Sequence, residues 1–122
     1  IANNAIILGN TVPEKGIKMK IEIKPEGPWF HGSNKIFSEL KAGSTVTQWE
    51  KLAEAFSHQP TMLSYDDDGT MIHNGTQKGY LYRIDEPVEI GKDIRQHPHT
   101  AMDKNAEFLT NRPLKVKRIR EW

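Results

Sequence analysis

Residues 47–58 carry the strongest helical pattern of the chain, and the segments after them carry strand and turn patterns. Four apolar residues recur at helical spacing on one face of this segment: Trp49, Leu52, Ala53 and Phe56. Thr47 and Glu50 have the spacing of a capping box, and Pro60 ends the run. Because helical signals come early and strand signals late, we expect an α+β fold with mostly antiparallel sheets and not a doubly wound parallel fold.

The strands predicted after this helix are separated by turn residues. They cover residues 61–65, 70–73, 79–84, 106–110 and 114–119. Before the helix, residues 20–24 and 29–31 predict short strands, and residues 33–43 predict a short helix begun by a serine cap. Residues 87–103 predict a loop with a helical turn near residues 90–94, and 66–69 predict an acidic turn.

Size and charge limit the classes of protein that fit. A chain of 122 residues is long enough for one domain. The net charge is +1, and the only dense basic run, Lys115 to Arg120, is more typical of a solvated strand than of a nucleic-acid patch. With no cysteine the chain has no disulfides, thiol nucleophiles or thiolate zinc sites.

No membrane contact is expected for this chain. No apolar run approaches the roughly 18–20 residues that a membrane span needs, and the N-terminal segment lacks the pattern of a signal peptide. We therefore expect a cytoplasmic protein with no membrane partner. Residues 1–18 differ in character from the rest and predict an extension that packs as an edge strand before a domain of residues 19–122.

The tripeptide His31-Gly32-Ser33 lies where a predicted strand ends. Glycine permits a close approach of the backbone to a ligand, so Gly32 can hold a planar amide through its N–H and C=O groups. The neighbouring His31 can form a hydrogen bond to a sugar hydroxyl. The alternative is an ordinary turn that contains a histidine.

Glu107 lies within the apolar segment 105–110. In a strand it shares a face with Leu109, while Ala106, Phe108 and Thr110 share the other. A carboxylate in such a strand costs several kcal/mol unless it is paired, hydrogen-bonded or lines a cleft. The alternative is an edge strand with an exposed glutamate.

Two other patterns suggest metal ions without meeting the requirements for them. His97 and His99 need further ligands, for which His73, Asp93 and Asp103 are candidates, but the spacing matches no known metal motif. The acidic residues 66–68 are contiguous, whereas an EF-hand alternates its ligands over a dozen positions. We therefore expect no metal site.

Taken in order, four segments resemble the ADP-ribosyltransferase superfamily, in the branch whose first motif is His-Gly-Ser/Thr. They are Phe30-His31-Gly32-Ser33, Leu63-Ser64, Gly79-Tyr80-Leu81-Tyr82 and Asn105-Ala106-Glu107-Phe108-Leu109. The resemblance covers roughly residues 28–121, and the short chain fits the rifamycin-modifying members better than the larger poly(ADP-ribose) polymerases. It implies a small fold of two packed, mostly antiparallel sheets with one or two helices, and NAD as the substrate.

The resemblance also implies roles for single residues. His31 would bind the 2′-hydroxyl of the nicotinamide ribose, Gly32 would hold the carboxamide through its backbone, and Ser33 would support that site. Glu107 would be the catalytic glutamate. Breaking the nicotinamide–ribose bond develops positive charge on the sugar, as in glycoside hydrolysis, and a nearby carboxylate stabilises that charge.

The sequence departs from the branch at two places. The branch usually has a tyrosine in the middle strand that stacks on nicotinamide, where this chain has Met62, followed by Ser64 in the same motif. Met62, Tyr65 or Tyr80 would take over that contact. Members of the rifamycin-modifying type carry an acidic residue in the loop where Asp93 lies, so Asp93 is a second candidate for the catalytic carboxylate.

Three functions follow from the resemblance. The first is transfer of ADP-ribose from NAD to an unidentified acceptor, which is a protein, a nucleic acid or a small molecule, or hydrolysis of NAD. The second is an RNA 2′-phosphotransferase-like activity, which needs several arginines on the phosphate, whereas Arg83, Arg95 and Arg112 are scattered. The third is a non-catalytic module of the same fold that binds NAD or another nucleotide.

Overall fold

The computed structural model describes residues 3–7, 22–66, 70–99 and 105–122. Within these residues the chain forms one helix, α1 (Glu50–Ser57), and ten strands. The strands are β1 (Asn3–Ile7), β2 (Phe30–Ser33), β3 (Glu39–Leu40), β4 (Thr45–Val46), β5 (Met62–Asp66), β6 (Met71–His73), β7 (Tyr80–Ile84), β8 (Ile94–Gln96), β9 (Phe108–Thr110) and β10 (Leu114–Glu121).

The strands form three sheets, in the orders β1-β5-β6, β2-β7-β10-β3 and β4-β9-β8. Every pairing between named strands is antiparallel. A single bridge between Phe30 and Thr47 joins the second sheet to the segment that follows β4. The prediction of an α+β fold with mostly antiparallel sheets is therefore confirmed, with three sheets in place of two.

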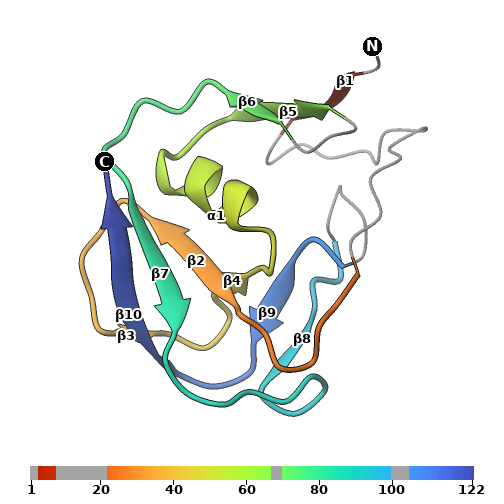
Figure 1. The fold of residues 1–122 in the computed structure, drawn as a ribbon, viewed down its shortest axis with the longest axis vertical. Coiled ribbons are helices and arrows are strands. Elements are labelled where there is room, and N and C mark those ends of the chain that lie inside the picture. Colours follow the sequence, from red (N-terminus) through yellow and green to blue (C-terminus); the bar gives the residue numbers. More distant parts are fainter. Residues whose placement is uncertain (1–2, 8–21, 67–69, 100–104) are drawn as a thin grey trace.

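Helix α1 lies between the first sheet, β1-β5-β6, and the sheet β2-β7-β10-β3, which we call the central sheet (Figure 1). On one side of the helix, Ala53 packs with Phe30 and Leu81 of the central sheet. On the other side, Leu52 packs with Leu63 and Tyr65 of β5. The helix forms because its apolar residues recur at helical spacing and are buried on both of these sides.

The opposite face of the central sheet holds the larger core. There Tyr82 of β7 packs in one cluster with Trp29, Val46 and Phe108, so this face is covered by the β4-β9-β8 sheet. Leu81 belongs instead to the cluster that contacts α1. The strand β7 is therefore buried on both faces, and its side chains alternate between the two clusters as the sequence predicted.

The predicted helix over residues 33–43 is wrong. Strand β2 continues through Ser33, and β3 pairs with β10. The ring of Phe37 stacks on Tyr82 at 4.6 Å, and the Tyr82 hydroxyl accepts a hydrogen bond from the Phe37 N–H and donates one to the Lys35 carbonyl. These contacts satisfy backbone groups that a helix would pair internally, and they leave Ile36 exposed.

Three smaller predictions also differ from the structure. Residues 94–96 form β8, paired with β9, where a loop was predicted. The turn predicted near residues 90–94 is present just before it, closed by a hydrogen bond from the Asp93 N–H to the Glu89 carbonyl at 2.8 Å. Residues 22–24 lie outside the strands. The capping box is absent because α1 begins later than the pattern predicts: Trp49 is the N-cap, and the Thr47 hydroxyl accepts a hydrogen bond from the Trp49 N–H.

Part of the N-terminal segment has a defined place. Strand β1 pairs with β5 at the edge of the first sheet, while residues 8–18 and residues 67–69 of the predicted acidic turn lie outside the described part of the chain. Among the residues that the structure describes, no helix is long and apolar enough to cross a membrane.

Candidate functional site

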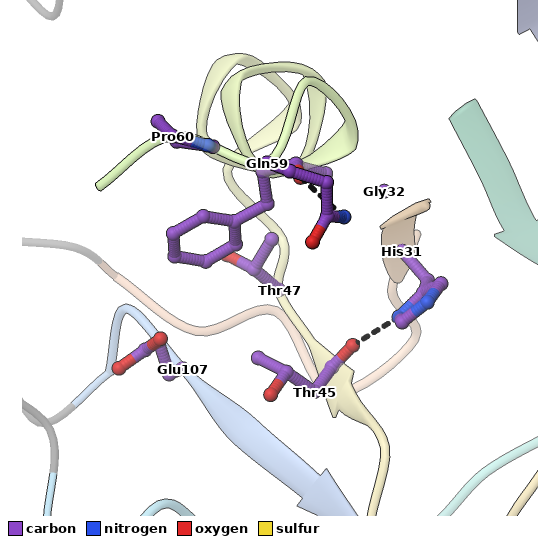
Figure 2. Close-up of a pocket in the computed structure, with 9 residues that line it drawn as sticks. His31, Gly32, Thr45, Thr47, Gln59, Pro60 and Glu107 are labelled. Atoms are coloured by element: carbon purple, nitrogen blue, oxygen red, sulfur yellow. Dashed lines mark hydrogen bonds between the residues drawn. The ribbon is translucent and has the colours of Figure 1, made fainter. Parts of the chain in front are cut away.

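A cavity of about 360 Å³ opens between strand β2, the β4 segment, the residue before β9 and the end of α1 (Figure 2). This volume lies within the range of roughly 300–1,000 Å³ that is usual for small-molecule sites. It is lined by His31, Gly32, Thr45, Thr47, Ala53, Phe56, Gln59, Pro60 and Glu107. The histidine and the glutamate that the sequence singled out thus line the same hollow.

Strand pairing explains how residues so far apart in sequence meet. In the β4–β9 pair, Thr45 faces Leu109 and Val46 faces Phe108, and this register continued by one residue sets Thr47 opposite Glu107. On its other side Thr47 bridges to Phe30, the residue before His31. Thr45 and Thr47 therefore lie between His31 and Glu107, as Figure 2 shows.

Glu107 lines the cavity because successive side chains in this extended segment point in alternate directions. Ala106 and Phe108 on either side are fully buried in two different clusters, whereas Glu107 is half-buried and lines the cavity. Its backbone carbonyl accepts a hydrogen bond from the His97 N–H, which ties the segment to the residue after β8. The carboxylate is thus held on a structured segment at the edge of the site.

The ring of His31 has a defined tautomer. Its Nδ1 atom lies 2.6 Å from the carbonyl oxygen of Thr45, and a carbonyl only accepts hydrogen bonds, so Nδ1 carries the proton. Burial lowers the pKa of His31 below its ordinary value, and the hydrogen bond to Thr45 opposes this shift less strongly. The ring is therefore neutral at pH 7, with Nε2 as an acceptor.

Gly32 presents its backbone at an open edge of β2. The backbone carbonyl of Trp29 points toward β7, because it accepts a hydrogen bond from the Ile84 N–H. The backbone N–H and C=O of Phe30 point away from β7, since both bond to Thr47, at 2.7 and 2.9 Å. Successive residues of an antiparallel strand alternate in this direction. The N–H and C=O of Gly32 consequently point to the same edge as those of Phe30, on the cavity side.

Packing of α1 also requires glycine at position 32. A Cβ atom on Gly32 would lie 1.8 Å from the Ala53 carbonyl oxygen and 2.8 Å from the Ser57 backbone nitrogen. These are helix backbone atoms that cannot move aside without displacing α1. Gly32 therefore serves both the contact between helix and strand and the access to the strand edge.

Six lining residues were not predicted as site residues, and among them are Thr45, Thr47, Phe56 and Gln59. The local pattern places Thr47 in a helix cap and Phe56 on the buried face of the helix, and Thr45 and Gln59 carry no signal. Thr45 and Thr47 enter the site because β4 pairs with β9, which no local pattern indicates. The segment before α1 thus supplies the middle of the site, in place of the predicted segment after it.

The residues predicted on β5 do not line this cavity. Tyr65 is buried between β5 and α1, with its ring 5.1 Å from that of Trp49 in an edge-on contact. Met62 is 48% exposed, and Ser64 is half-buried on the same strand. Met62 and Tyr65 thus lie on opposite sides of β5, and neither lines the cavity.

Two further predicted residues also lie outside the lining. Tyr80 has the cations of Lys78 and Arg118 at 5.8 and 5.5 Å from its ring centre. The Ser33 hydroxyl accepts a hydrogen bond from the Lys35 N–H and is buried. Ser33 therefore supports the turn after β2, and the aromatic side chain that lines the cavity is Phe56.

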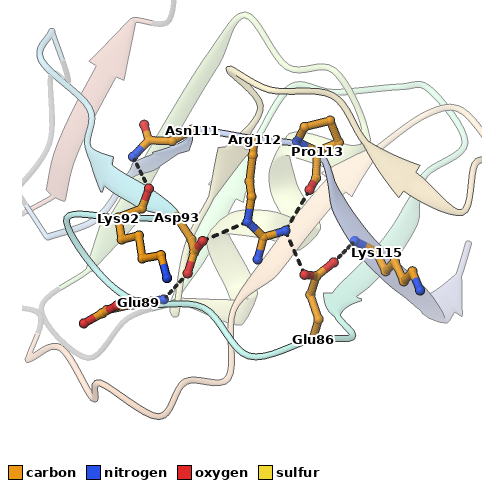
Figure 3. A network of polar contacts seen from close by, with 8 residues as sticks. All are labelled: Glu86, Glu89, Lys92, Asp93, Asn111, Arg112, Pro113 and Lys115. Atoms are coloured by element: carbon orange, nitrogen blue, oxygen red, sulfur yellow. Dashed lines mark hydrogen bonds and ion pairs between the residues drawn. The ribbon is translucent and has the colours of Figure 1, made fainter.

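Asp93 belongs to a separate polar network (Figure 3). Its carboxylate accepts hydrogen bonds from the Arg112 Nε and the Glu89 N–H, both at 2.8 Å, and Arg112 also pairs with Glu86 at 2.8 Å. The hydrogen bond from Arg112 is the main reason that the pKa of Asp93 is lowered. Asp93 is thus engaged in holding the turn before β8, and it does not line the cavity.

The described residues hold no group of three or more histidine, aspartate or glutamate side chains that could bind a metal. His97 instead accepts a hydrogen bond at Nδ1 from the His99 N–H. Asp103, one of the ligands considered, lies outside the described residues.

A larger hollow of about 690 Å³ lies elsewhere, beside Trp29, Arg83 and Glu86, and contains none of the predicted site residues.

Comparisons with known proteins add no relative. No protein-family model matches the chain, and no match is found among curated proteins or solved structures.

Proposed function

We propose that the cavity binds the nicotinamide–ribose half of NAD and that the chain cleaves the bond between nicotinamide and ribose, passing ADP-ribose to an acceptor or to water. The observation that supports this proposal is the presence of His31, the open edge at Gly32, and Glu107 around one cavity. The resemblance of the motifs around these residues to ADP-ribosyltransferases supports it independently.

Each of these protein groups has a chemical partner on the proposed ligand. The carboxamide of nicotinamide offers one acceptor and two donors, which match the N–H and C=O of Gly32 at the edge of β2. The neutral His31 offers Nε2 to a ribose hydroxyl. Phe56 supplies the aromatic wall for the nicotinamide ring in place of the expected tyrosine.

The reaction needs charge stabilisation more than a nucleophile. As the C–N bond breaks, nicotinamide leaves with the bonding electron pair, and positive charge develops on the ribose. The Glu107 carboxylate stabilises that charge from a half-buried position, where electrostatic interactions are stronger than in water. Water or the acceptor then forms the new bond to the ribose carbon and loses its proton.

The arginines disfavour the phosphotransferase alternative. None of Arg83, Arg95 and Arg112 lines this cavity, and Arg112 is paired with Glu86 and Asp93. A 2′-phosphate would therefore find no arginine among the lining residues of the described chain.

Calorimetric titration of NAD combined with a nicotinamide-release assay tests the proposal. An ADP-ribosyltransferase or NAD glycohydrolase gives both binding heat and free nicotinamide. Heat without nicotinamide release supports the non-catalytic binding module instead. If NAD produces neither, the proposed function is wrong.

A further inference from the structure

Gln59 has a backbone conformation that glutamine rarely adopts. Its φ is +54°, and it is the only residue other than glycine with a positive φ in the described part of the chain. It directly follows α1 and the C-cap residue His58. Helices commonly end in this left-handed conformation, but the residue there is usually glycine, because a side chain adds strain.

The side chain of Gln59 lines the cavity and is hydrogen-bonded to the end of α1. Its Nε2 atom lies 3.3 Å from the carbonyl oxygen of Phe56. Because a carbonyl only accepts, the amide nitrogen faces the helix end, and the Oε1 atom faces away from it. Figure 2 shows the side chain directed into the space between the helix end and His31, with Gly32 and Thr47 nearby.

We infer that Gln59 selects for the carboxamide of the nicotinamide ring, an inference that rests on the proposed function. Its Oε1 atom is an acceptor and would take a hydrogen bond from the carboxamide NH₂ group. The C=O of Gly32, at the strand edge on the cavity side, is a second acceptor. A carboxylate in the same place, as in nicotinic acid, has no donor and would set its negative oxygens against both acceptors.

The strain at Gln59 supports a role for its side chain. Glycine would satisfy the turn without strain, and Gln59 is exposed, so no core packing requires a large residue there. Strained residues tend to occur where a binding site needs them. If Gln59 served only as a cap for the Phe56 carbonyl, its removal would change stability but not ligand preference.

Two substitutions separate recognition from strain. Gln59→Gly removes the amide and relieves the strained φ, and we expect the melting temperature to rise by about 3–6 °C. Gln59→Ala removes the amide but keeps the strain, so no rise is expected. In both variants the preference for nicotinamide over nicotinic acid, measured as a ratio of dissociation constants, should fall at least about tenfold. Gln96→Ala changes an exposed glutamine outside the cavity and is the matched control.

The outcomes distinguish this assignment from the proposed function. If the wild-type protein binds nicotinamide and the preference over nicotinic acid is unchanged in Gln59→Gly and Gln59→Ala, the role of Gln59 alone is overturned. A wild-type protein that binds neither nicotinamide nor NAD overturns the proposed function and this inference with it. Loss of the preference in both variants, with the control unchanged, supports the assignment.

Discussion

The Nδ1 atom of His31 donates a hydrogen bond to the carbonyl oxygen of Thr45 across the gap between β2 and β4. This contact joins the two strands just beyond the point where Phe30 and Thr47 bridge them. It also determines which ring nitrogen of His31 is free to accept. The pH dependence of stability and the chemistry of the site both depend on this arrangement.

Acid should destabilise the protein through His31. Burial lowers the pKa of His31 below 6.5, so the unfolded chain binds a proton at a pH where the folded chain does not. The free energy of unfolding therefore falls as the pH decreases from about 6.5 through the folded pKa. His73 contributes in the same direction, because burial and then the nearby His58 lower its pKa.

Urea unfolding of His31→Asn at several pH values checks this prediction. The asparagine amide keeps a donor toward Thr45 but does not titrate, so the variant should show a smaller loss of stability between about pH 7.5 and about pH 5. His99→Asn, at an exposed position, is the control. Equal pH dependence in wild type and His31→Asn would contradict the assigned protonation state.

Removal of the Glu107 charge should slow the reaction without preventing binding. In Glu107→Gln we expect nicotinamide release to fall at least about a hundredfold, because the developing charge on the ribose loses its carboxylate. NAD binding should persist. Glu39→Gln, at an exposed position of strand β3, should leave the rate unchanged. A rate that survives in Glu107→Gln and is lost in Asp93→Asn would assign the role to Asp93.

Gly32→Ala should destabilise the fold more than a glycine substitution in open space. The new Cβ would overlap the Ala53 carbonyl, and we expect a loss of about 3 kcal/mol. Gly43 has a φ of +87°, but a Cβ added there would meet no atom within 4 Å, so Gly43→Ala should cost only about 1 kcal/mol. Chemical denaturation measures both. A smaller loss for Gly32→Ala than for Gly43→Ala would show that α1 does not pack on Gly32 as described.

Asp93→Asn should affect stability and spare the reaction. The substitution weakens the contacts with Arg112 and the Glu89 N–H that hold the turn before β8, so the melting temperature should fall. Because the pKa values of Asp93 and Glu86 are lowered, their contribution to stability is lost as the pH falls below about 4. Nicotinamide release per folded molecule should stay within about twofold of wild type.

Periodic segments were predictable from the sequence, and segments shaped by distant contacts were not. The helix near residues 50–57 and the alternation in β7 follow from local apolar spacing. The apolar spacing in residues 33–43 also suggested a helix, but the Tyr82 ring and hydroxyl supply other partners for Phe37 and Lys35. Local spacing cannot reveal such a partner, because Tyr82 lies far along the chain.

The same distinction applies to the cavity. Glu107 could be singled out as a carboxylate within an apolar segment, and His31 and Gly32 could be singled out as neighbours at the end of a predicted strand. The places of Thr45 and Thr47 in the lining depend on the register between β4 and β9, and the place of Gln59 depends on a backbone angle. None of these three positions leaves a pattern in the sequence.

The most direct test of the account is a ¹H–¹⁵N NMR titration of the protein with NAD. We expect the largest shifts in the amide signals of Gly32, Thr47, Gln59 and Glu107, which surround the proposed nicotinamide site. Shifts concentrated instead around Arg83 and Trp29 in the larger hollow, or no shifts at saturating NAD, would contradict the claim that the cavity between His31 and Glu107 binds this ligand.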